Sequence, residues 1–226
     1  MNNSSRYEYP IDLAVDSTAT KLIKLVGHDR TVLELGCASG TMSRVLRDHG
    51  CWIVGVEIDA GAARKSSSFC HRVIVGDLDQ LDLAAHLGTE TFDVILAADV
   101  LEHLRDPGAL LLRLQAFLKP QGRIVVSLPN VAHVSVVAAL LAGRFDYREI
   151  GLLDRTHLRF FTPATAAELL EEAGFEVTAT EFTVTGRNEI DADPNWRRLP
   201  WLLRYLLKRR KGCDIFQIIL EGRLAE

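Results

Sequence analysis

Short apolar runs alternate with helix-like segments through the first 130 residues of the chain. The runs have the length of buried strands, and between them apolar positions recur every three or four residues, as on one face of a helix. The runs predict strands over 32–35, 52–56, 73–75, 92–97 and 123–128, and the periodic segments predict helices over 13–26, 41–49, 60–68, 80–87 and 107–118. Strands alternating with helices indicate a doubly wound α/β fold around a mostly parallel sheet.

The pattern changes after Pro129. We expect helices over 131–143 and 163–173 and strands over 175–184 and 213–221. We interpret the chain as a single domain, 1–226, whose expected parts are an N-terminal segment and helix (1–28), a cap over the substrate (130–162) and a basic amphipathic insertion (186–212).

Composition adds limits on location and partners. Of the 226 residues, 48% are hydrophobic and 25% charged, and the formal net charge of −4 gives no basic field for nucleic acid. The sequence contains no apolar run near the roughly 20 residues of a membrane-spanning helix. The N-terminus lacks an apolar signal core, and the four cysteines form no C-x-x-C pair. We therefore expect a cytoplasmic protein with reduced thiols.

The turn after the first strand has the chemistry of a ligand site. Gly36 and Gly40 bracket it, and Ser39 is placed to cap the helix that follows. A glycine-lined turn at a helix N-terminus can leave backbone N–H groups free to hold a charged or polar ligand. An ordinary strand-to-helix turn would contain similar residues. The residues that follow the other strands therefore decide between a ligand site and an ordinary turn.

Acidic residues follow the next two strands, and ligands of such sheets bind beyond the carboxyl ends of the strands. Glu57 comes 21 residues after Gly36, where a carboxylate can accept both hydroxyls of a ribose. Asp77 and Leu78 would then lie beside an adenine. The dinucleotide fingerprint G-x-G-x-x-G is absent, and Glu34 beside the turn suits an ammonium and repels a pyrophosphate. S-adenosylmethionine is thus favoured over a dinucleotide, with an NAD(P)-dependent oxidoreductase as the alternative.

These residues also resemble a known family. Residues 34–40 resemble motif I of the class I S-adenosylmethionine-dependent methyltransferases, and 54–59, 76–78, 92–95 and 118–123 resemble its following motifs, with Gln121 in place of a glycine. Among its members the chain is most similar to small-molecule enzymes such as the ubiquinone-pathway O-methyltransferases. The resemblance implies a Rossmann-like sheet of seven strands with the last antiparallel, and methyl transfer from a sulfonium.

The resemblance also implies roles for individual residues. The implied cofactor-binding residues are Glu34, Gly36, Cys37, Ala38, Gly40, Glu57, Ile58, Asp77, Leu78 and Asp99. The first five would line the methionine half of the cofactor, Glu57 would bind the ribose, and Ile58 would pack against the adenine. Tyr7 and Tyr9 would either close over the cofactor or fill surface or core positions.

Two histidines are candidate bases for the transfer, which needs a base only where the acceptor must lose a proton. His103 follows the fourth strand, and His157 lies in a stretch that resembles a substrate-side segment of the ubiquinone-type enzymes. Either could instead be a structural histidine. Asp99, Glu102 and His103 resemble a group that can hold a divalent cation in those enzymes, but acids here also cap helices. We predict that no metal is bound.

The expected cap supplies candidate substrate contacts. Phe145, Tyr147 and Phe160 could line an apolar pocket, and Arg155 could receive a carboxylate or phosphate or pair with a neighbouring acid. The insertion is more distinctive, because 196–211 contains seven Lys or Arg and no acid, with leucines on one helical face. Such a helix can pack on the domain or a second subunit, or lie on an anionic membrane, while nucleic acid fits less well.

The sequence therefore predicts an S-adenosylmethionine-dependent methyltransferase acting on a hydroxyl, or less favourably an amine, of a small molecule. Alternatives are N-methylation of a natural product and methylation of a saccharide or lipid-linked substrate. Two further alternatives are the oxidoreductase and a module that holds the nucleoside without turnover.

Overall fold

The computed structural model describes residues 10–225. The strands are β1 (Thr31–Leu35), β2 (Trp52–Glu57), β3 (Arg72–Val75), β4 (Phe92–Ala98), β5 (Leu118–Pro129), β6 (Phe175–Val184) and β7 (Ile215–Leu224). The helices are α1 (Thr18–Val26), α2 (Thr41–Asp48), α3 (Ala60–Ser66), α4 (Leu83–Leu87), α5 (Pro107–Leu114), α6 (Val134–Leu141), α7 (Pro163–Glu172), α8 (Arg187–Ala192), α9 (Pro194–Arg198) and α10 (Trp201–Lys208), with short 3₁₀ turns η2 (Leu101–His103) and η3 (Gln115–Phe117).

All seven strands form one sheet in the order β3-β2-β1-β4-β5-β7-β6. The pairs from β3 to β5 are parallel, and β7 runs antiparallel to both of its neighbours. The expected fold class, a mostly parallel seven-stranded sheet with an antiparallel last strand, is therefore confirmed. Because the winding direction reverses between β1 and β4, a crevice is expected beyond the carboxyl ends of these strands.

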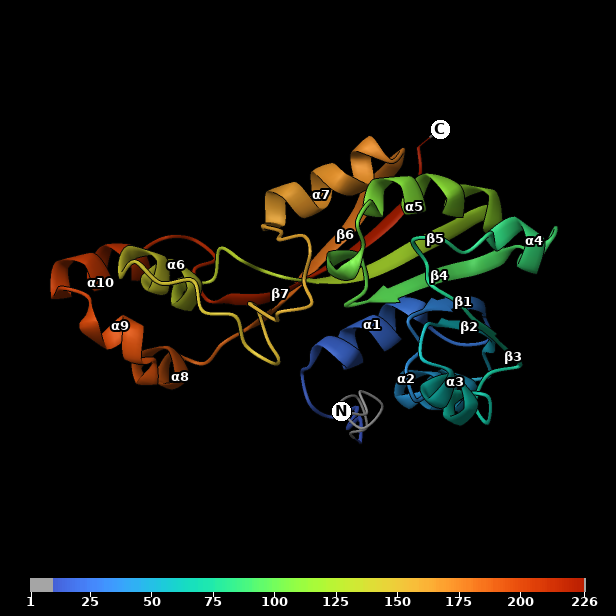
Figure 1. The fold of residues 1–226 in the computed structure, drawn as a ribbon, viewed down its shortest axis with the longest axis horizontal. Coiled ribbons are helices and arrows are strands. Elements are labelled where there is room, and N and C mark those ends of the chain that lie inside the picture. Colours follow the sequence, from blue (N-terminus) through green and yellow to red (C-terminus); the bar gives the residue numbers. More distant parts are fainter. Residues whose placement is uncertain (1–9, 226) are drawn as a thin grey trace.

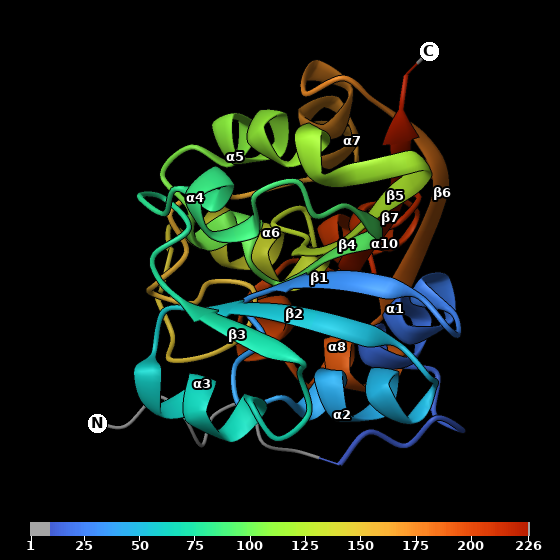
Figure 2. The same cartoon turned by 90° about the vertical axis from the view of Figure 1, so that its right-hand side faces the viewer.

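Helices cover both faces of the sheet (Figure 2). On one face α4, α5 and α7 cover the larger apolar cluster, and on the other α1 and α2 cover a second cluster with the opposite faces of the same strands. The continuous burial of strands such as β4 follows from this arrangement, because every side chain from Val94 to Ala97 meets helices on one face or the other.

Two expectations at helix starts were wrong. The first helix begins at Thr18 and not at residue 13, because the Ser17 hydroxyl accepts the Thr20 N–H and caps it there. Ser39 does not cap the second helix. Gly40 is the N-cap residue, in the left-handed region at φ 84°, and no side chain caps α2, while the buried Ser39 hydroxyl has no hydrogen-bond partner within residues 10–225.

The two insertions expected as separate features pack together. Val134 and Ala138 of α6 share a small apolar cluster with Ile190, Trp196 and further residues from 186–213. The helices α6, α8, α9 and α10 form a unit at one end of the sheet, at the left of Figure 1. No helix within residues 10–225 is long and apolar enough to span a membrane.

The basic stretch 196–211 is not one continuous amphipathic helix. Trp196 is 1% exposed and donates its indole N–H to Asp191, so it is a core residue and does not face a membrane. The chain then turns at Leu199, which is also buried, and Pro200 precedes α10. The longest helix of this stretch is therefore the eight-residue α10, and Arg197 and Arg198 of α9 are exposed as well.

Candidate functional site

The carboxyl ends of the central strands meet at one edge of the sheet. In the ladder, Leu35 of β1 lies opposite Val56 of β2 and Ala97 of β4. The residues that follow these positions therefore come together, as the sequence predicts. A cavity of about 670 Å³ opens there, and Ala98, Gly36 and Glu57 line it.

Nine of the ten residues predicted to hold the cofactor line this cavity. They are Glu34, Gly36, Cys37, Ala38, Glu57, Ile58, Asp77, Leu78 and Asp99. Gly40 does not line it and lies behind the turn, beside a second, smaller hollow. A Cβ at Gly40 would be 2.7 Å from the Phe69 ring and 2.9 Å from the Ser66 Cα, so this glycine permits close packing of α2 on the end of α3 and the segment after it.

The clash at Gly40 gives a stability prediction. We expect Gly40→Ala to lower the free energy of unfolding by about 3 kcal/mol, since it adds a clash with backbone to the cost of a left-handed alanine. Gly143 is a matched control, with φ 72° and nothing within 4 Å of its would-be Cβ, and Gly143→Ala should cost only about 1 kcal/mol. Denaturant unfolding measures both, and equal losses would contradict the packing role.

The turn from Gly36 to Gly40 does not present the expected row of free N–H groups. The Cys37 N–H donates to the Val56 carbonyl (3.1 Å), and the Gly40 N–H donates to the Cys37 carbonyl (2.9 Å). The Ala38 N–H donates to the Glu57 carboxylate (2.8 Å). The protein itself satisfies these three donors, and acidic side chains, including Glu34, Glu57 and Asp77, line the cavity.

Glu57 is fixed by the backbone on two sides. One carboxylate oxygen accepts the Ala38 N–H and the other accepts the Asp59 N–H, both at 2.8 Å. A carboxylate has about four lone-pair positions, so two acceptor positions remain. Glu57 lines the cavity, so these positions are open to hydroxyl or N–H donors of a ligand.

Glu34 faces the cavity from the end of β1 while being 4% exposed. The Ser43 hydroxyl donates to its carboxylate at 2.6 Å. Burial is the main cause that raises the pKa of Glu34 to about 8, with smaller contributions from Cys70 and Glu57 and against the lowering effect of the Ser43 hydrogen bond. This carboxyl favours a cationic ligand, because a nearby positive charge stabilises its ionised form.

The far side of the cavity combines apolar and acidic groups. Ile58 is 66% exposed, Leu78 is buried, and both line the cavity. Asp77 accepts the Asp79 N–H at 3.0 Å through one oxygen and the Gln80 amide at 3.3 Å through the other. A flat heterocycle with exocyclic donors would find both apolar contact and an acceptor here.

Sequence reasoning missed a wall of the cavity. Thr18, Ala19 and Leu22 of α1 and Thr156 of the expected cap also line it. The periodicity of α1 marks Leu22 as a core residue and gives no sign that the start of the helix reaches the strand ends. Tyr7 and Tyr9, considered as a cover for the cofactor, lie outside the described residues.

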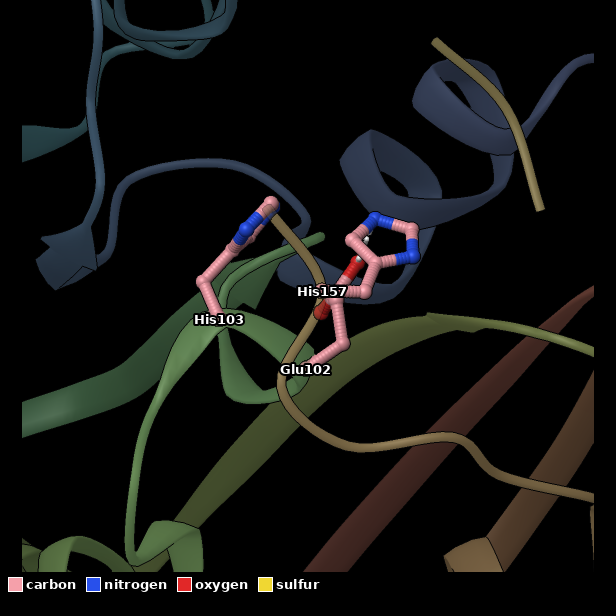
Figure 3. A group of neighbouring side chains, drawn as sticks. All are labelled: Glu102, His103 and His157. Carbon is pink, nitrogen blue, oxygen red and sulfur yellow. Dashed lines mark ion pairs between the residues drawn. The ribbon is translucent and has the colours of Figure 1, made fainter. Parts of the chain in front are cut away.

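His103 lines the cavity and His157 does not. Figure 3 shows the side chains of both histidines together with that of Glu102. The Nδ1 of His103 is 3.2 Å from the Thr156 carbonyl, which can only accept, so Nδ1 carries the proton. The Nε2 of neutral His103 therefore keeps its lone pair and can take a proton. His157 is 8% exposed, its ring lies 4.8 Å from that of His103, and its Nε2 is 4.0 Å from a Glu102 oxygen.

The residues around His103 also fit a divalent cation. Ligand atoms of Glu102, His103 and His157 lie within 4.8 Å of one another, and neither Glu102 oxygen accepts a hydrogen bond from residues 10–225. The grouping differs from the Asp99–Glu102–His103 set considered from the sequence, because His157 takes the place of Asp99. Asp99, at φ 53°, accepts the Ser127 hydroxyl at 2.9 Å. One carboxylate and two imidazoles suit transition metals better than Mg²⁺.

None of the residues predicted to bind the acceptor lines the cavity. Phe145 packs edge-on against Tyr147 and Phe160, with ring centroids 5.4 and 5.6 Å apart. The ring of Phe160 lies 6.3 Å from that of His157, so this aromatic cluster borders the histidine pair. Arg155 is ion-paired with Glu149 at 2.7 Å, with both side chains exposed.

A family model described as a methyltransferase domain matches residues 12–180. A ubiquinone biosynthesis O-methyltransferase of Azorhizobium caulinodans is 28% identical over 172 residues, covering 70% of this chain and 66% of the relative. The enzyme of the same name from Thiobacillus denitrificans is 25% identical over 180 residues, covering 74% and 76%. The chain thus spans about two thirds to three quarters of these relatives' length.

Solved structures share the fold at lower identity. A SAM-dependent methyltransferase of Archaeoglobus fulgidus is 18% identical, with a TM-score of 0.65 and 90% of each chain covered. The CcbJ methyltransferase of Streptomyces caelestis is also 18% identical, with a TM-score of 0.64 and coverage of 99% of this chain and 96% of that one. With the family model matching most of the chain, the protein belongs to the methyltransferase-domain family and is a class I SAM-dependent methyltransferase.

Proposed function

We propose that the enzyme transfers a methyl group from S-adenosylmethionine to a hydroxyl of a small molecule, with His103 as the general base. The observation that carries this proposal is the hydrogen bond from His103 Nδ1 to the Thr156 carbonyl, which leaves the other nitrogen of a cavity-lining imidazole as an acceptor. An amine acceptor already has a free lone pair when neutral, so a positioned base favours a hydroxyl.

In this proposal each part of the cavity binds a different part of S-adenosylmethionine. Glu34 holds the ammonium, Glu57 the two ribose hydroxyls, and Asp77 the edge of the adenine. S-adenosylmethionine supplies an activated methyl on a sulfonium. The acceptor oxygen forms its bond to this carbon in line as the carbon–sulfur bond breaks, and His103 takes the hydroxyl proton at Nε2. Gly36, Cys37, Ala38, Ile58, Leu78 and Asp99 are proposed as the remaining cofactor contacts.

A labelling experiment identifies the acceptor. An extract of the source organism receives S-adenosylmethionine labelled in the methyl group together with the purified enzyme. We expect a labelled O-methyl product that is absent without the enzyme. A labelled N-methyl product, whether a natural product or another amine, would contradict the hydroxyl assignment, and label on a saccharide or lipid-linked compound would define the acceptor class.

The role of His103 is tested on that acceptor. We expect His103→Asn to lower kcat by about 100-fold or more with unchanged cofactor affinity, because the amide can still donate to Thr156 but cannot take a proton. His157→Ala should have a smaller effect, since this side chain does not line the cavity. His86→Asn, an exposed histidine on α4, is the control. Turnover of His103→Asn equal to that of the control would rule out the base.

The metal alternative is tested separately. A divalent cation held by Glu102, His103 and His157 would act as a Lewis acid on the acceptor hydroxyl. If this cluster binds a metal, Zn²⁺ or Mn²⁺ raises the melting temperature of the wild type and leaves that of Glu102→Gln unchanged. The proposal of a metal-independent base expects no shift in either protein, and full turnover after treatment with a chelator.

We also propose a cytoplasmic location. The support is that all four cysteines, Cys37, Cys51, Cys70 and Cys213, are buried free thiols, as is usual in a reducing compartment.

A further inference from the structure

The basic segment, residues 196–211, concentrates positive charge in an otherwise acidic chain. Its seven Lys and Arg contrast with a formal net charge of −4 for the whole sequence. Among the described residues only Lys208 of these seven has a carboxylate partner, Asp191 at 2.7 Å. Arg198 and Lys211 are exposed and Arg204 is partly exposed, and none of the three is ion-paired within residues 10–225. The segment therefore offers uncompensated cations to a partner.

The helix α10 within this segment has two apolar sides. Leu203 and Leu207 pack inward against the small cluster around Trp196. Four large side chains point the other way, with exposed fractions of 51–72%, and we call them the outer face: Trp201, Leu202, Tyr205 and Leu206. At 100° per residue they form one stripe, and Arg204 and Lys208 border it.

The outer face lies at the same end of the molecule as the cavity. The unit of α6, α8, α9 and α10 projects beyond the end of the sheet toward which β4 runs (Figure 1). The cavity opens at the carboxyl end of β4, where Ala98 and Asp99 line it. Leu140 and Leu141, at the end of α6 in the same unit, are also more than half exposed. A flat partner covering α10 would therefore approach the end of the molecule at which the cavity opens.

We propose that the outer face and the basic segment dock the enzyme on an anionic membrane surface. Exposed aromatic and leucine side chains flanked by cations are the composition of helices that lie in the headgroup region. Phosphates of anionic lipids pair with Arg198, Arg204 and Lys211, while Trp201 and Leu202 enter the acyl boundary. A second copy fits less well, because an isologous contact would place two basic segments against each other.

Docking extends the proposed function, on which this step rests, to acceptors held at the bilayer interface. A hydroxyl compound carried by a lipid or partitioned into the headgroup region would meet the cavity without crossing bulk water. The acceptor class is then amphiphilic or lipid-linked.

Vesicle sedimentation tests the docking without any acceptor. The full chain is mixed with phosphatidylcholine vesicles with and without phosphatidylglycerol, at low and high salt. We expect binding only to the anionic vesicles, weaker at high salt. Leu202→Ser with Leu206→Ser removes half of the outer face, and Arg204→Glu with Lys211→Glu reverses two cations. Each pair should weaken binding at least about tenfold.

Matched controls use exposed residues elsewhere. Leu112→Ser on α5 changes an equally exposed leucine, and Lys24→Glu with Arg64→Glu reverses two exposed cations on α1 and α3. These variants should bind vesicles as the wild type does. The proposal is overturned if the wild type ignores anionic vesicles, or if the test pairs bind like the controls. It is also overturned if gel filtration shows a dimer that the two serines dissociate, without vesicle binding.

Calorimetry with S-adenosylmethionine separates the two proposals. The Leu202→Ser, Leu206→Ser variant should bind the cofactor with wild-type affinity, because neither residue lines the cavity. Loss of vesicle binding with intact cofactor binding supports the docking surface. Wild-type protein that binds the cofactor but no anionic vesicles refutes docking alone, and wild-type protein that binds these vesicles but no cofactor refutes the proposed function alone.

Discussion

Glu57→Ala weakens the binding of S-adenosylmethionine by about 100-fold or more, because each hydrogen bond from a hydroxyl to this carboxylate is worth about 1.5–3 kcal/mol. The side chain already accepts the Ala38 and Asp59 N–H groups, so its orientation toward the cavity is set before the ligand arrives. Alanine removes the ribose acceptors and also leaves these two donors without their partner. Titration calorimetry measures the affinity.

Two further variants separate ribose binding from support of the turn. Glu57→Gln keeps the size of the side chain but replaces one acceptor oxygen by a donor, so it should lose most of the affinity as well. Glu168→Ala removes an exposed carboxylate on α7 and should bind like the wild type. Thermal unfolding of each variant checks that the sheet is intact. Wild-type affinity in a folded Glu57→Ala variant would refute the ribose assignment.

Glu34 makes the stability of the empty enzyme fall as the pH rises from about 4.5 to 8. Its pKa in the folded protein is about 8, against 4.5 for the ordinary side chain, so the folded state keeps a proton that the unfolded state releases. The stabilisation from this retained proton is fully present below pH 4.5 and is lost as the pH rises through 8. The shift corresponds to about 5 kcal/mol in the free energy of unfolding.

Glu34→Gln cannot titrate and should remove this slope. Denaturant unfolding of both proteins at pH 5.5, 7 and 8.5 compares their stabilities, and the variant should gain relative to the wild type as the pH rises. Glu176→Gln on β6, an exposed position, provides the control for a lost carboxylate. Stability curves for wild type and Glu34→Gln that run parallel with pH would contradict a protonated Glu34.

The same carboxyl links cofactor binding to a proton. An ammonium beside Glu34 favours the ionised carboxylate, so binding at pH 7 should release close to one proton, through the pKa of about 8 in the empty enzyme. Calorimetry in buffers of different ionisation enthalpy counts released protons. Glu34→Gln should release none at this site, and an equal release from both proteins would contradict contact between the ammonium and Glu34.

The sheet and the cofactor cavity could be predicted because both follow from local patterns. Short apolar runs define the strands, and the parallel winding places the residues after them at one edge. Glu57 and Asp77 could thus be assigned to one site from their positions alone. The cysteines indicated a reducing compartment, and the absence of a dinucleotide fingerprint disfavoured an NAD(P)-dependent oxidoreductase. Neither inference requires knowledge of contacts.

Other features depend on contacts between distant segments, which periodicity does not encode. Trp196 lies in a basic stretch whose composition is typical of a membrane anchor. It is nevertheless buried against α6, and its indole N–H donates to Asp191. The Ser39 cap failed because Gly40 adopts a positive φ and becomes the N-cap itself. His157 is far from Glu102 in sequence and lies beside it only because the chain folds back within the expected cap. From the sequence, Asp99 was therefore the nearer candidate for a metal group with Glu102 and His103.

The central claim is that the cavity at the carboxyl ends of β1 to β4 holds S-adenosylmethionine. Titration calorimetry of the wild-type chain with S-adenosylmethionine and, separately, with NAD tests it most directly. We expect one-to-one binding of S-adenosylmethionine, abolished by excess S-adenosylhomocysteine, and no heat with NAD. Binding of NAD without binding of S-adenosylmethionine would contradict the assignment of the cavity.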